Sequence, residues 1–439
     1  MSAEQQPLRR AGGAEILTIG DELLRGEIVD SNKSYLSDRL LSLDIETRFH
    51  TSVRDDPEDM IEAFERARTR SGVVLVSGGL GPTRDDLTIE ILARAFGRKL
   101  VLHEPSLAAI RAFFERFGRE MAKNNEKQAW FPEGAEALPN PVGTAPGTLL
   151  REGDTLFFCM PGVPRELHRM MDEQVLPRIA AVQPGGRVVR SRLLRTFGMG
   201  ESNLDERLGD LARDGDVVLG FRTSFPDNLL RPLARGDSAE EAETKLAGVV
   251  EAIRERLGAM VYGEGEEPLE SVLGAMLRDA GETLAVAESC TGGELAERIT
   301  RVAGASDYFL GGVVAYANEA KTKLLGVSPA LLAEHGAVSE PVVCAMARGV
   351  RERLGADFGV ATTGISGPGG GSEEKPVGTV FVAVARAEAE GGVHAERFWF
   401  PFERERHRQL TTQVALDWVR RALLGEDLVA ARYLQQDRS

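Results

Sequence analysis

The chain has 439 residues, about three times the ~150 residues of a typical domain, so two or three domains are expected. Hydrophobic residues make up 42% and charged residues 28%, which excludes a largely disordered protein. The 53 Lys and Arg against 68 Asp and Glu give a net charge of −15, which argues against a protein that coats nucleic acid. No apolar run approaches the ~20 residues of a membrane span, and the polar start of the chain shows no signal peptide. We therefore expect a cytoplasmic protein without a membrane partner or a specific nucleic-acid partner.

Cysteine and histidine are scarce. Cys159, Cys290 and Cys344 lie far apart and are odd in number, so no disulfide framework is expected. The six histidines form no ligand cluster with a cysteine, which leaves little material for a zinc site.

The first part of the chain alternates short buried strands with helices. The expected strands are 14–19, 45–53, 73–77 and 155–160, and the expected helices are 31–41, 58–70, 86–96, 105–117 and 163–175. This alternation predicts an α/β/α domain, over 14–175, whose parallel sheet is covered on both faces.

A composition change marks the middle. From Arg187 to Arg235 there are nine Arg and no Lys, against seven acidic residues. Strands at 188–197, 217–223 and 229–235 and helices at 201–212 and 238–257 predict a small α+β module over 176–263. GEGEEP (263–268) has the composition of a linker.

The last part, 264–425, is again predicted to be α/β. The expected strands are 283–287, 311–316, 358–363, 378–384 and 396–401, and the expected helices are 268–280, 293–303, 318–326, 340–354 and 404–423.

Three loops of the first domain follow strands: GDELLRGEIVDSN (20–32), SGGLGPTRDD (77–86) and MPGVPREL (160–167). The glycines of the second loop let backbone amides approach an anionic ligand. Asp85 and Asp86 are suited to holding a divalent cation, although they could equally be helix caps. Asp21 and Glu22 could complete that site or belong to a solvated turn.

In this order and spacing, TIGDELLRG, SGGLGPTRDD and MPGVPREL resemble the CinA (competence/damage-inducible) family over roughly 14–260. The resemblance implies a domain similar to the MogA/MoaB molybdopterin-binding fold, which uses a divalent cation (Mg, Mn or Co) to cleave ADP-ribose to AMP and ribose 5-phosphate. It places the metal on Asp85 and Asp86. The nucleotide would bind Gly20, Asp21, Glu22, Gly78, Gly79, Gly81, Pro82, Thr83, Pro161 and Gly162.

The middle module resembles the KH-type module of the same family. It lacks a clear G-x-x-G clamp of the kind that KH modules use on nucleic acid, and GMGES (198–202) does not supply one. We therefore expect a packing or dimer role for this module.

The densest motif of the last domain is LAVAESCTGG (284–293). A strand, a sharp turn and a Gly pair that opens a helix would place the Ser289 hydroxyl near backbone amides that stabilise an oxyanion or a phosphate. The alternative is that Ser or Thr here is an ordinary N-cap.

A serine nucleophile needs a base, and no histidine occurs between Glu282 and Glu334. His335, His394 or His407 could still approach in space. Lysine is the other choice, and YANEAKTK (316–323) offers Lys321 near a helix N-terminus, where the dipole favours a neutral amine. Tyr316 could relay a proton or donate to the oxyanion. The alternative is that Lys321 and Lys323 are solvated.

The third motif, TTGISGPGGG (362–371), can wrap a phosphate with amides and hydroxyls, or can be a flexible surface loop. Together the three motifs resemble the CinA/PncC amidase domain over roughly 266–425. The resemblance implies removal of the amide of nicotinamide mononucleotide as ammonia, without a cofactor, by Ser289, Tyr316 and Lys321. Cys290 competes as nucleophile. The expected substrate-binding residues are Thr291, Gly292, Gly293, Asn318, Thr363, Gly364, Ser366, Gly367, Gly369 and Gly370.

The family resemblance also implies a homodimer. Two other functions stay open. The N-terminal domain could be a non-catalytic nucleotide-binding module that regulates the amidase. A role in DNA uptake or repair, which the family name suggests, gets little support from the charge of −15.

Overall fold

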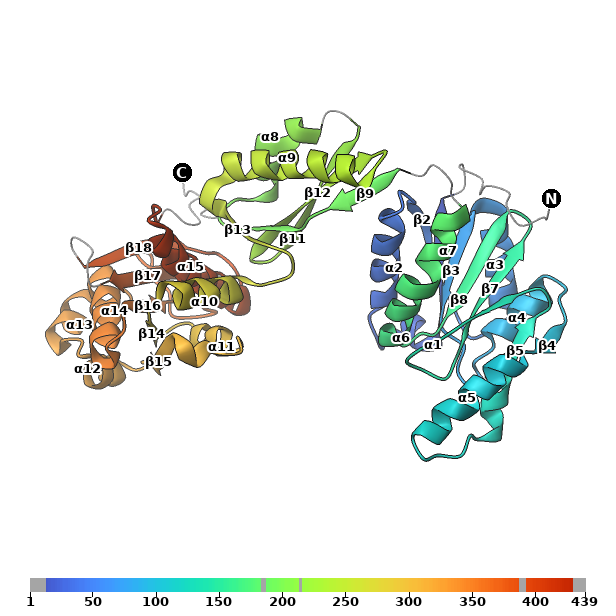
Figure 1. The fold of residues 1–439 in the computed structure, drawn as a ribbon. Coiled ribbons are helices and arrows are strands. Elements are labelled where there is room, and N and C mark those ends of the chain that lie inside the picture. Colours follow the sequence, from blue (N-terminus) through green and yellow to red (C-terminus); the bar gives the residue numbers. More distant parts are fainter. Residues whose placement is uncertain (1–12, 183–186, 213–214, 387–391, 429–439) are drawn as a thin grey trace. The chain divides into compact units, whose positions relative to one another are not determined.

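The computed structural model describes residues 13–182, 187–212, 215–386 and 392–428 (Figure 1). The chain divides into two compact units. The first contains residues up to 190 together with 235–243, and the second contains 191–234 together with the rest of the chain. Among the described residues, no helix is both long and apolar enough to cross a bilayer.

A six-stranded sheet of order β2-β1-β3-β8-β7-β6 forms the centre of the first unit (Figure 1). Strands β2, β1, β3 and β8 are parallel, so their carboxyl ends meet at one edge of the sheet. The strands are β1 (Ala14–Ile19), β2 (Thr47–Val53), β3 (Val73–Ser77), β6 (Glu136–Leu138), β7 (Gly147–Glu152) and β8 (Thr155–Met160). The helices are α1 (Asp21–Leu24), α2 (Ser31–Leu41), α3 (Pro57–Arg70), α4 (Thr88–Ala95), α5 (Glu104–Arg116), α6 (Pro164–Met170) and α7 (Leu176–Val182).

Helices cover both faces of this sheet because neighbouring residues of each strand point to opposite faces. Ile16 and Leu75 pack with α2 and α6, whereas Leu17 and Val76 pack with α3 and α4. The predicted α/β/α fold of this part is confirmed.

The far edge of the sheet differs from the all-parallel prediction. β7 is antiparallel to β8, and β6 is antiparallel to β7. Gly153 turns the chain between β7 and β8 with a φ of 59°, and so short a loop cannot hold the crossover that parallel strands need. Two further short strands, β4 (Leu100–Leu102) and β5 (Trp130–Pro132), form a separate pair, with a 3-10 helix at Lys123–Ala129 before β5. The helix expected at 163–175 is α6 followed by a π-helical turn at Met171–Val175.

The middle module is an antiparallel sheet of order β11-β12-β10-β13, with β9 on β12. Leu204 and Leu246 of its two long helices pack on Leu230 of the sheet, as a small α+β module requires. Its elements are β9 (Val188–Ser191), β10 (Leu194–Thr196), α8 (Glu201–Leu208), β11 (Val217–Ser224), β12 (Asp227–Gly236), α9 (Ala239–Leu257) and β13 (Val261–Glu264). The expected strand 188–197 is therefore two strands, and β13 runs into the segment interpreted as a linker.

The C-terminal sheet has the order β15-β14-β16-β17-β18 (Figure 1). β14 is parallel to β15 and β16, whereas β17 and β18 continue the sheet in antiparallel fashion. The strands are β14 (Leu284–Glu288), β15 (Phe309–Val314), β16 (Phe358–Gly364), β17 (Thr379–Arg386) and β18 (Val393–Trp399). The helices are α10 (Leu269–Ala280), α11 (Glu294–Thr300), α12 (Asn318–Leu325), α13 (Pro329–His335), α14 (Glu340–Leu354) and α15 (Arg404–Leu424).

Two layers of helices enclose this sheet. Val286 and Val382 face α10, α11 and α15, whereas Ala287 and Ala383 face α12 and α14. The alanines let α14 approach the sheet closely. Because β14 and β16 are parallel, the motifs that follow them lie at the same edge of the sheet.

Candidate active sites

The first candidate site lies where β14 ends. Ser289 follows the strand, and its amide donates to Thr362 O of the neighbouring β16 at 3.0 Å. Lys321 lies in the first turn of α12 and is 1% exposed. Its Nζ is 3.1 Å from Ser289 Oγ. The structure thus brings together two residues that are 32 positions apart in the sequence.

The Lys321 amine has three oxygen neighbours. Besides Ser289 Oγ, its Nζ contacts Ala315 O at 2.8 Å and Tyr316 O at 3.1 Å. Burial lowers the pKa of Lys321 below its usual value, because desolvation disfavours the charged form. The alternative that both lysines are solvated is wrong for Lys321, although Lys323 is exposed.

The histidines lie elsewhere. His407 is fully buried, and its Nε2 lies 3.3 Å from Gly378 O. Burial lowers the pKa of His407 to about 4. The His394 ring packs against Trp418. Among the described residues no histidine contacts Ser289, so Lys321 is the base candidate within hydrogen-bond reach.

Cys290 is buried beside Ser289, and burial raises the pKa of its thiol to about 12. A thiol with so high a pKa supplies very little thiolate near neutral pH. The environment therefore favours the Ser289 hydroxyl over the Cys290 thiol as nucleophile.

Glu288, the last residue of β14, is fully buried and caps α11. Its carboxylate accepts from the amides of Gly293, Leu295 and Ala296 at 2.9, 3.0 and 2.9 Å. Gly292 N donates to Ser289 O at 3.2 Å. Neither Ser nor Thr caps this helix, and the amides of the Gly pair, which were expected to meet an anion, are already bonded inside the protein.

The other expected substrate residues divide into two groups. Thr291 Oγ1 bonds Thr362 Oγ1 at 2.8 Å, and Thr363 Oγ1 donates to Ala337 O at 2.8 Å, so both hydroxyls hold the loops together. Asn318 and Tyr316 are exposed at the start of α12. The Tyr316 hydroxyl is 3.5 Å from Arg404, whereas the Tyr316 carbonyl contacts Lys321.

Two arginines of α15 were not predicted. Arg404 donates to Gly367 O of the 362–371 loop at 2.9 Å. Arg408 donates through Nε to Thr291 O at 2.9 Å. Together with Gly292 and Gly293 they line an open hollow at the surface. The sequence feature that could have revealed them is the i, i+4 spacing of two arginines at the start of a helix. Their contacts join two motifs that lie far apart in the sequence.

The second candidate site lies at the carboxyl edge of β1, β3 and β8, where the three predicted loops meet. Asn32 Nδ2 donates to Ser77 Oγ at 3.1 Å and to Gly162 O at 2.8 Å. A Cβ added to Gly78, whose φ is 105°, would lie 2.2 Å from Ile19 O. Only glycine allows so close an approach of two loop backbones.

The two predicted metal ligands, Asp85 and Asp86, have different surroundings. Asp86 Oδ2 accepts from Thr83 N at 2.8 Å and from Thr83 Oγ1 at 2.6 Å, and so stabilises its own loop. Lys127 Nζ donates to Thr83 O. Asp85 is exposed, and neither aspartate caps α4.

Asp55 was missed by the sequence analysis. It follows β2, and its Oδ2 accepts from Asp21 N at 3.0 Å. Burial raises the pKa of Asp55, and the carboxylates of Glu22, Asp21 and Asp85 raise it further. Carboxylates from three loops therefore lie close enough to repel one another. Within the described ranges, no group of three or more His, Cys, Asp or Glu side chains is arranged to hold a metal ion.

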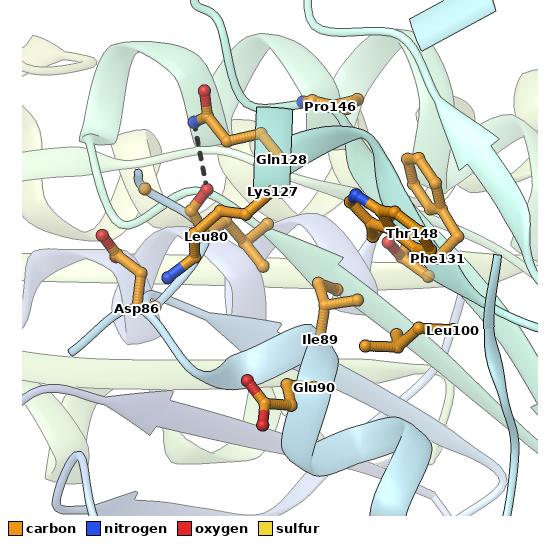
Figure 2. A pocket seen from close by; sticks show the side chains of 13 residues that line it. Leu80, Asp86, Ile89, Glu90, Leu100, Lys127, Gln128, Phe131, Pro146 and Thr148 are labelled. Carbon is orange, nitrogen blue, oxygen red and sulfur yellow. Dashed lines mark hydrogen bonds between the residues drawn. The ribbon is translucent and has the colours of Figure 1, made fainter. Parts of the chain in front are cut away.

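A pocket of about 240 Å³ opens beside the Gly79–Gly81 loop (Figure 2). Trp130 and Phe131 contribute aromatic walls, and Asp86 and Glu90 contribute carboxylates. Gln128, also in its wall, donates to Leu80 O at 3.2 Å and ties the 123–129 segment to the loop. Polar side chains such as Lys127 and Thr148 share the wall with the two aromatic side chains, and an aromatic wall suits a flat ring.

Three family models match the chain. The model described as CinA C-terminal domain matches residues 266–423, the one described as probable molybdopterin binding domain matches 15–181, and the one described as damage-inducible protein CinA KH domain matches 191–263.

Relatives match over nearly the whole chain. The CinA-like protein of Geobacter sulfurreducens is 44% identical over 409 residues, which are 93% of this chain and 98% of that protein. The CinA-like protein of Anaeromyxobacter sp. is 46% identical over 413 residues, 93% of this chain and 98% of that protein. The crystal structure of the protein CinA with unknown function from Thermoplasma acidophilum is 32% identical and covers 39% of this chain and 100% of that chain, with a TM-score of 0.37.

Proposed function

The chain belongs to the CinA family, and from that premise we propose that its C-terminal part hydrolyses the carboxamide of nicotinamide mononucleotide to nicotinate mononucleotide and ammonia. The observation that carries the proposal is the buried amine of Lys321, 3.1 Å from Ser289 Oγ. Two observations favour amide hydrolysis. The family is consistent with a hydrolase-type role, and Ser289 has a candidate base, Lys321, within hydrogen-bond distance.

The contacts of Lys321 suit a general base. A neutral amine has two N–H groups and one lone pair. The two N–H groups are satisfied by Ala315 O and Tyr316 O, which leaves the lone pair directed at the Ser289 proton. Burial favours the neutral form relative to an exposed lysine, because it lowers the pKa of the amine.

The reaction balances with these two groups. Ser289 Oγ attacks the carboxamide carbon while Lys321 takes the hydroxyl proton, and a tetrahedral intermediate forms. Its collapse breaks the C–N bond, and Lys321 returns the proton to the departing nitrogen, which leaves as ammonia. Water then attacks the acyl ester, Lys321 takes the water proton, and the acid leaves as Ser289 recovers its hydrogen.

The oxyanion of that intermediate needs backbone donors. In the described part of the turn, the amides of Cys290 and Thr291 have no protein carbonyl as partner, whereas those of Gly292 and Gly293 are bonded. We therefore assign the oxyanion to the amides of Cys290 and Thr291, the two residues that precede the Gly pair.

The 5′-phosphate is assigned to the 364–370 loop and to Arg404. Arg404 contacts the carbonyl of Gly367 and lies 3.5 Å from the hydroxyl of the exposed Tyr316, so a cation and an aromatic side chain lie beside this loop. Guanidinium and loop amides suit a phosphate.

For the N-terminal part we propose cleavage of ADP-ribose to AMP and ribose 5-phosphate. Support comes from the amide-rich loop at Gly78–Gly81, the carboxylates beside it, and the aromatic pocket, which suits the adenine ring. Asp85, with the remaining oxygen of Asp86, would hold a divalent cation, and the donor chemistry fits a hard cation of the Mg, Mn or Co type. When bound, such a cation would neutralise charge on the pyrophosphate oxygens.

The competing function is a nucleotide-binding module without turnover. The absence of a formed metal cluster among the described residues favours it. Calorimetry with ADP-ribose, with and without Mg²⁺, beside an assay for AMP separates the two, because binding without AMP release identifies a module.

Ammonia release from nicotinamide mononucleotide by the purified full-length chain is the direct test of the amidase. Failure to release ammonia above a Ser289→Ala control would contradict the proposal. Sedimentation of the same sample tests the proposed homodimer.

A further inference from the structure

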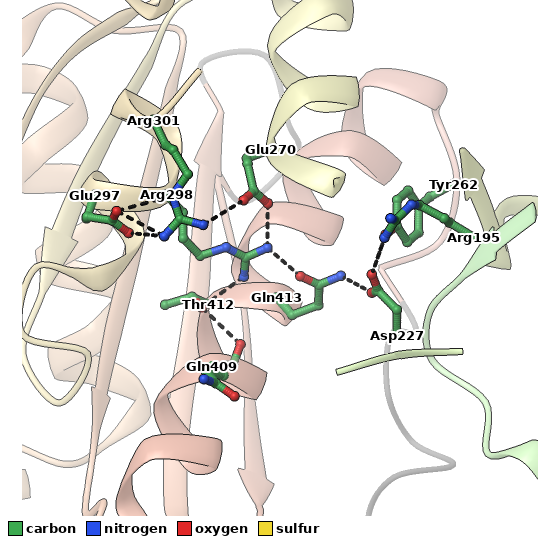
Figure 3. Close-up of polar contacts among 10 residues, drawn as sticks. All are labelled: Arg195, Asp227, Tyr262, Glu270, Glu297, Arg298, Arg301, Gln409, Thr412 and Gln413. Atoms are coloured by element: carbon green, nitrogen blue, oxygen red, sulfur yellow. Dashed lines mark hydrogen bonds and ion pairs between the residues drawn. The ribbon is translucent and has the colours of Figure 1, made fainter. Parts of the chain in front are cut away.

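A row of buried polar side chains joins the middle module to the C-terminal sheet, within the second compact unit (Figure 3). Asp227, at the start of β12, is 8% exposed, and Gln413 of α15 is 1% exposed. Gln413 Nε2 donates to Asp227 Oδ1 at 2.6 Å. A buried carboxylate of one module is therefore satisfied by an amide of the other.

The remaining neighbours of Asp227 are also donors. Tyr262 Oη donates to Asp227 Oδ2 at 2.5 Å, and Arg195 lies 3.4 Å from the same oxygen. Burial raises the pKa of Asp227 to about 6, so the carboxylate is mostly ionised at pH 7. Both oxygens act as acceptors, which fixes the direction of every hydrogen bond around them.

Gln413 passes this fixed direction of hydrogen bonding on to Arg298. An amide has its donor and acceptor on opposite sides, so donating to Asp227 turns the Gln413 oxygen the other way. That oxygen accepts from Arg298 at 2.6 Å. Arg298 also donates to Glu270 at 2.7 Å and to Thr412 Oγ1 at 3.0 Å.

Arg298 belongs to α11, the helix that starts directly after the Ser289 turn. The amino end of α11 is held by the Glu288 carboxylate, and its far side is held by Arg298. The two anchors hold both the first turn and the second half of this seven-residue helix, and the Ser289 turn connects to the first of them.

We infer that Asp227 of the middle module positions the catalytic turn, through Gln413 and Arg298, and that the module is thus a working part of the amidase site. Asp227, Gln413 and Arg298 are positioning residues, because none of them contacts the reacting atoms. The inference rests on the proposed amidase function for its kinetic consequence, but the packing of α11 can be measured without any substrate.

The test uses the full chain and hydrogen exchange at the α11 amides. Asp227→Asn keeps the size of the side chain but leaves only one acceptor oxygen. Because Arg195 can only donate, that oxygen should stay with Arg195, and the new NH2 then faces Gln413, whose oxygen turns away from Arg298 to accept from it. We expect α11 to exchange about tenfold faster. Asp210→Asn is the matched control, because Asp210 pairs with Arg256 at the surface of the same module. It should leave α11 unchanged.

A compensating pair separates positioning from general damage. In the double variant Asp227→Asn with Gln413→Glu, the new amide donates to the new carboxylate, which still accepts from Arg298. Exchange of α11 should return toward the wild-type rate, and kcat for ammonia release, lowered in Asp227→Asn with little change in KM, should recover with it. Gln413→Met interrupts the same link from the other side and should reproduce the fast exchange if Asp227→Asn does not fold.

Unchanged α11 exchange in Asp227→Asn or Gln413→Met, or no recovery in the double variant, overturns the inference. A wild-type chain that releases no ammonia contradicts the proposed function instead, and the exchange measurements still decide the positioning role.

Discussion

The two candidate sites differ in how much of their chemistry is already assembled. In the C-terminal site, the proposed nucleophile and the proposed base are in contact, both buried, and the helix beside them is capped by an internal carboxylate. In the N-terminal site, the loops are tightly joined, but exposed and partly buried carboxylates repel one another. A reaction that uses only side chains can be built into the folded chain, whereas one that needs a cation leaves its charges unbalanced until the cation binds.

The largest effect should come from the nucleophile. Ser289→Ala removes the attacking oxygen and should lower kcat for ammonia release by about 10³-fold or more. Cys290→Ala, its matched neighbour, should retain most activity because the thiol is protonated at neutral pH. Retained activity in Ser289→Ala together with loss in Cys290→Ala would reverse the two roles.

Removing the base should cost nearly as much. Lys321→Met fills the same buried space without an amine and should lower kcat by about 10²- to 10⁴-fold. In the wild type, kcat/KM should rise with pH as Lys321 loses its proton, with a midpoint below the usual 10.5 because burial lowers the pKa. A rate that is flat or falls across that range would show that Lys321 does not act as a neutral base.

The N-terminal site should respond to one carboxylate. Asp85→Asn should lower metal-dependent AMP release from ADP-ribose by about 10²-fold, because one charge is lost from the cation site. Ammonia release should not change, since the two chemistries use different residues. Equal AMP release in wild type, Asp85→Asn and Asp86→Asn would place the cation elsewhere.

The smallest effect should fall on substrate binding. Arg404→Ala should raise KM for nicotinamide mononucleotide by about tenfold, the loss of one charge-assisted contact. Nicotinamide riboside lacks the phosphate and should show no such change. Arg406→Ala is the control, since Arg406 is exposed on the same helix and pairs with Glu403. An equal change for both substrates would remove Arg404 from the phosphate site.

Helices and strands were predicted well where their own residues show a regular apolar spacing. The helices at 31–41 and 340–354 have the predicted bounds, because apolar spacing marks their buried faces. The side chain that caps the first helix is Asp30, which accepts from Lys33 N. The hairpin at Gly153 was missed, since a two-residue turn leaves little composition to detect.

Contacts between distant segments were harder to predict. Lys321 could be found because its motif follows the strand next to β14, and parallel neighbours end at the same edge. Asp55 reaches its site through the pairing of β2 with β1, which depends on strand order. Arg404 and Arg408 lie on a helix more than a hundred residues after Ser289, and only the folded sheet brings them back.

The burial of Lys321 also has a consequence for folding. In the unfolded chain its amine has the usual pKa of 10.5, whereas burial lowers the pKa in the folded core. Folding therefore releases a proton from Lys321 where the pH lies between the lowered pKa of the folded state and that usual value. Because the unfolded state then binds more protons, this residue makes the fold less stable in acid and lets it gain stability as the pH rises. The amine that activates the serine is acquired by assembly of the core itself.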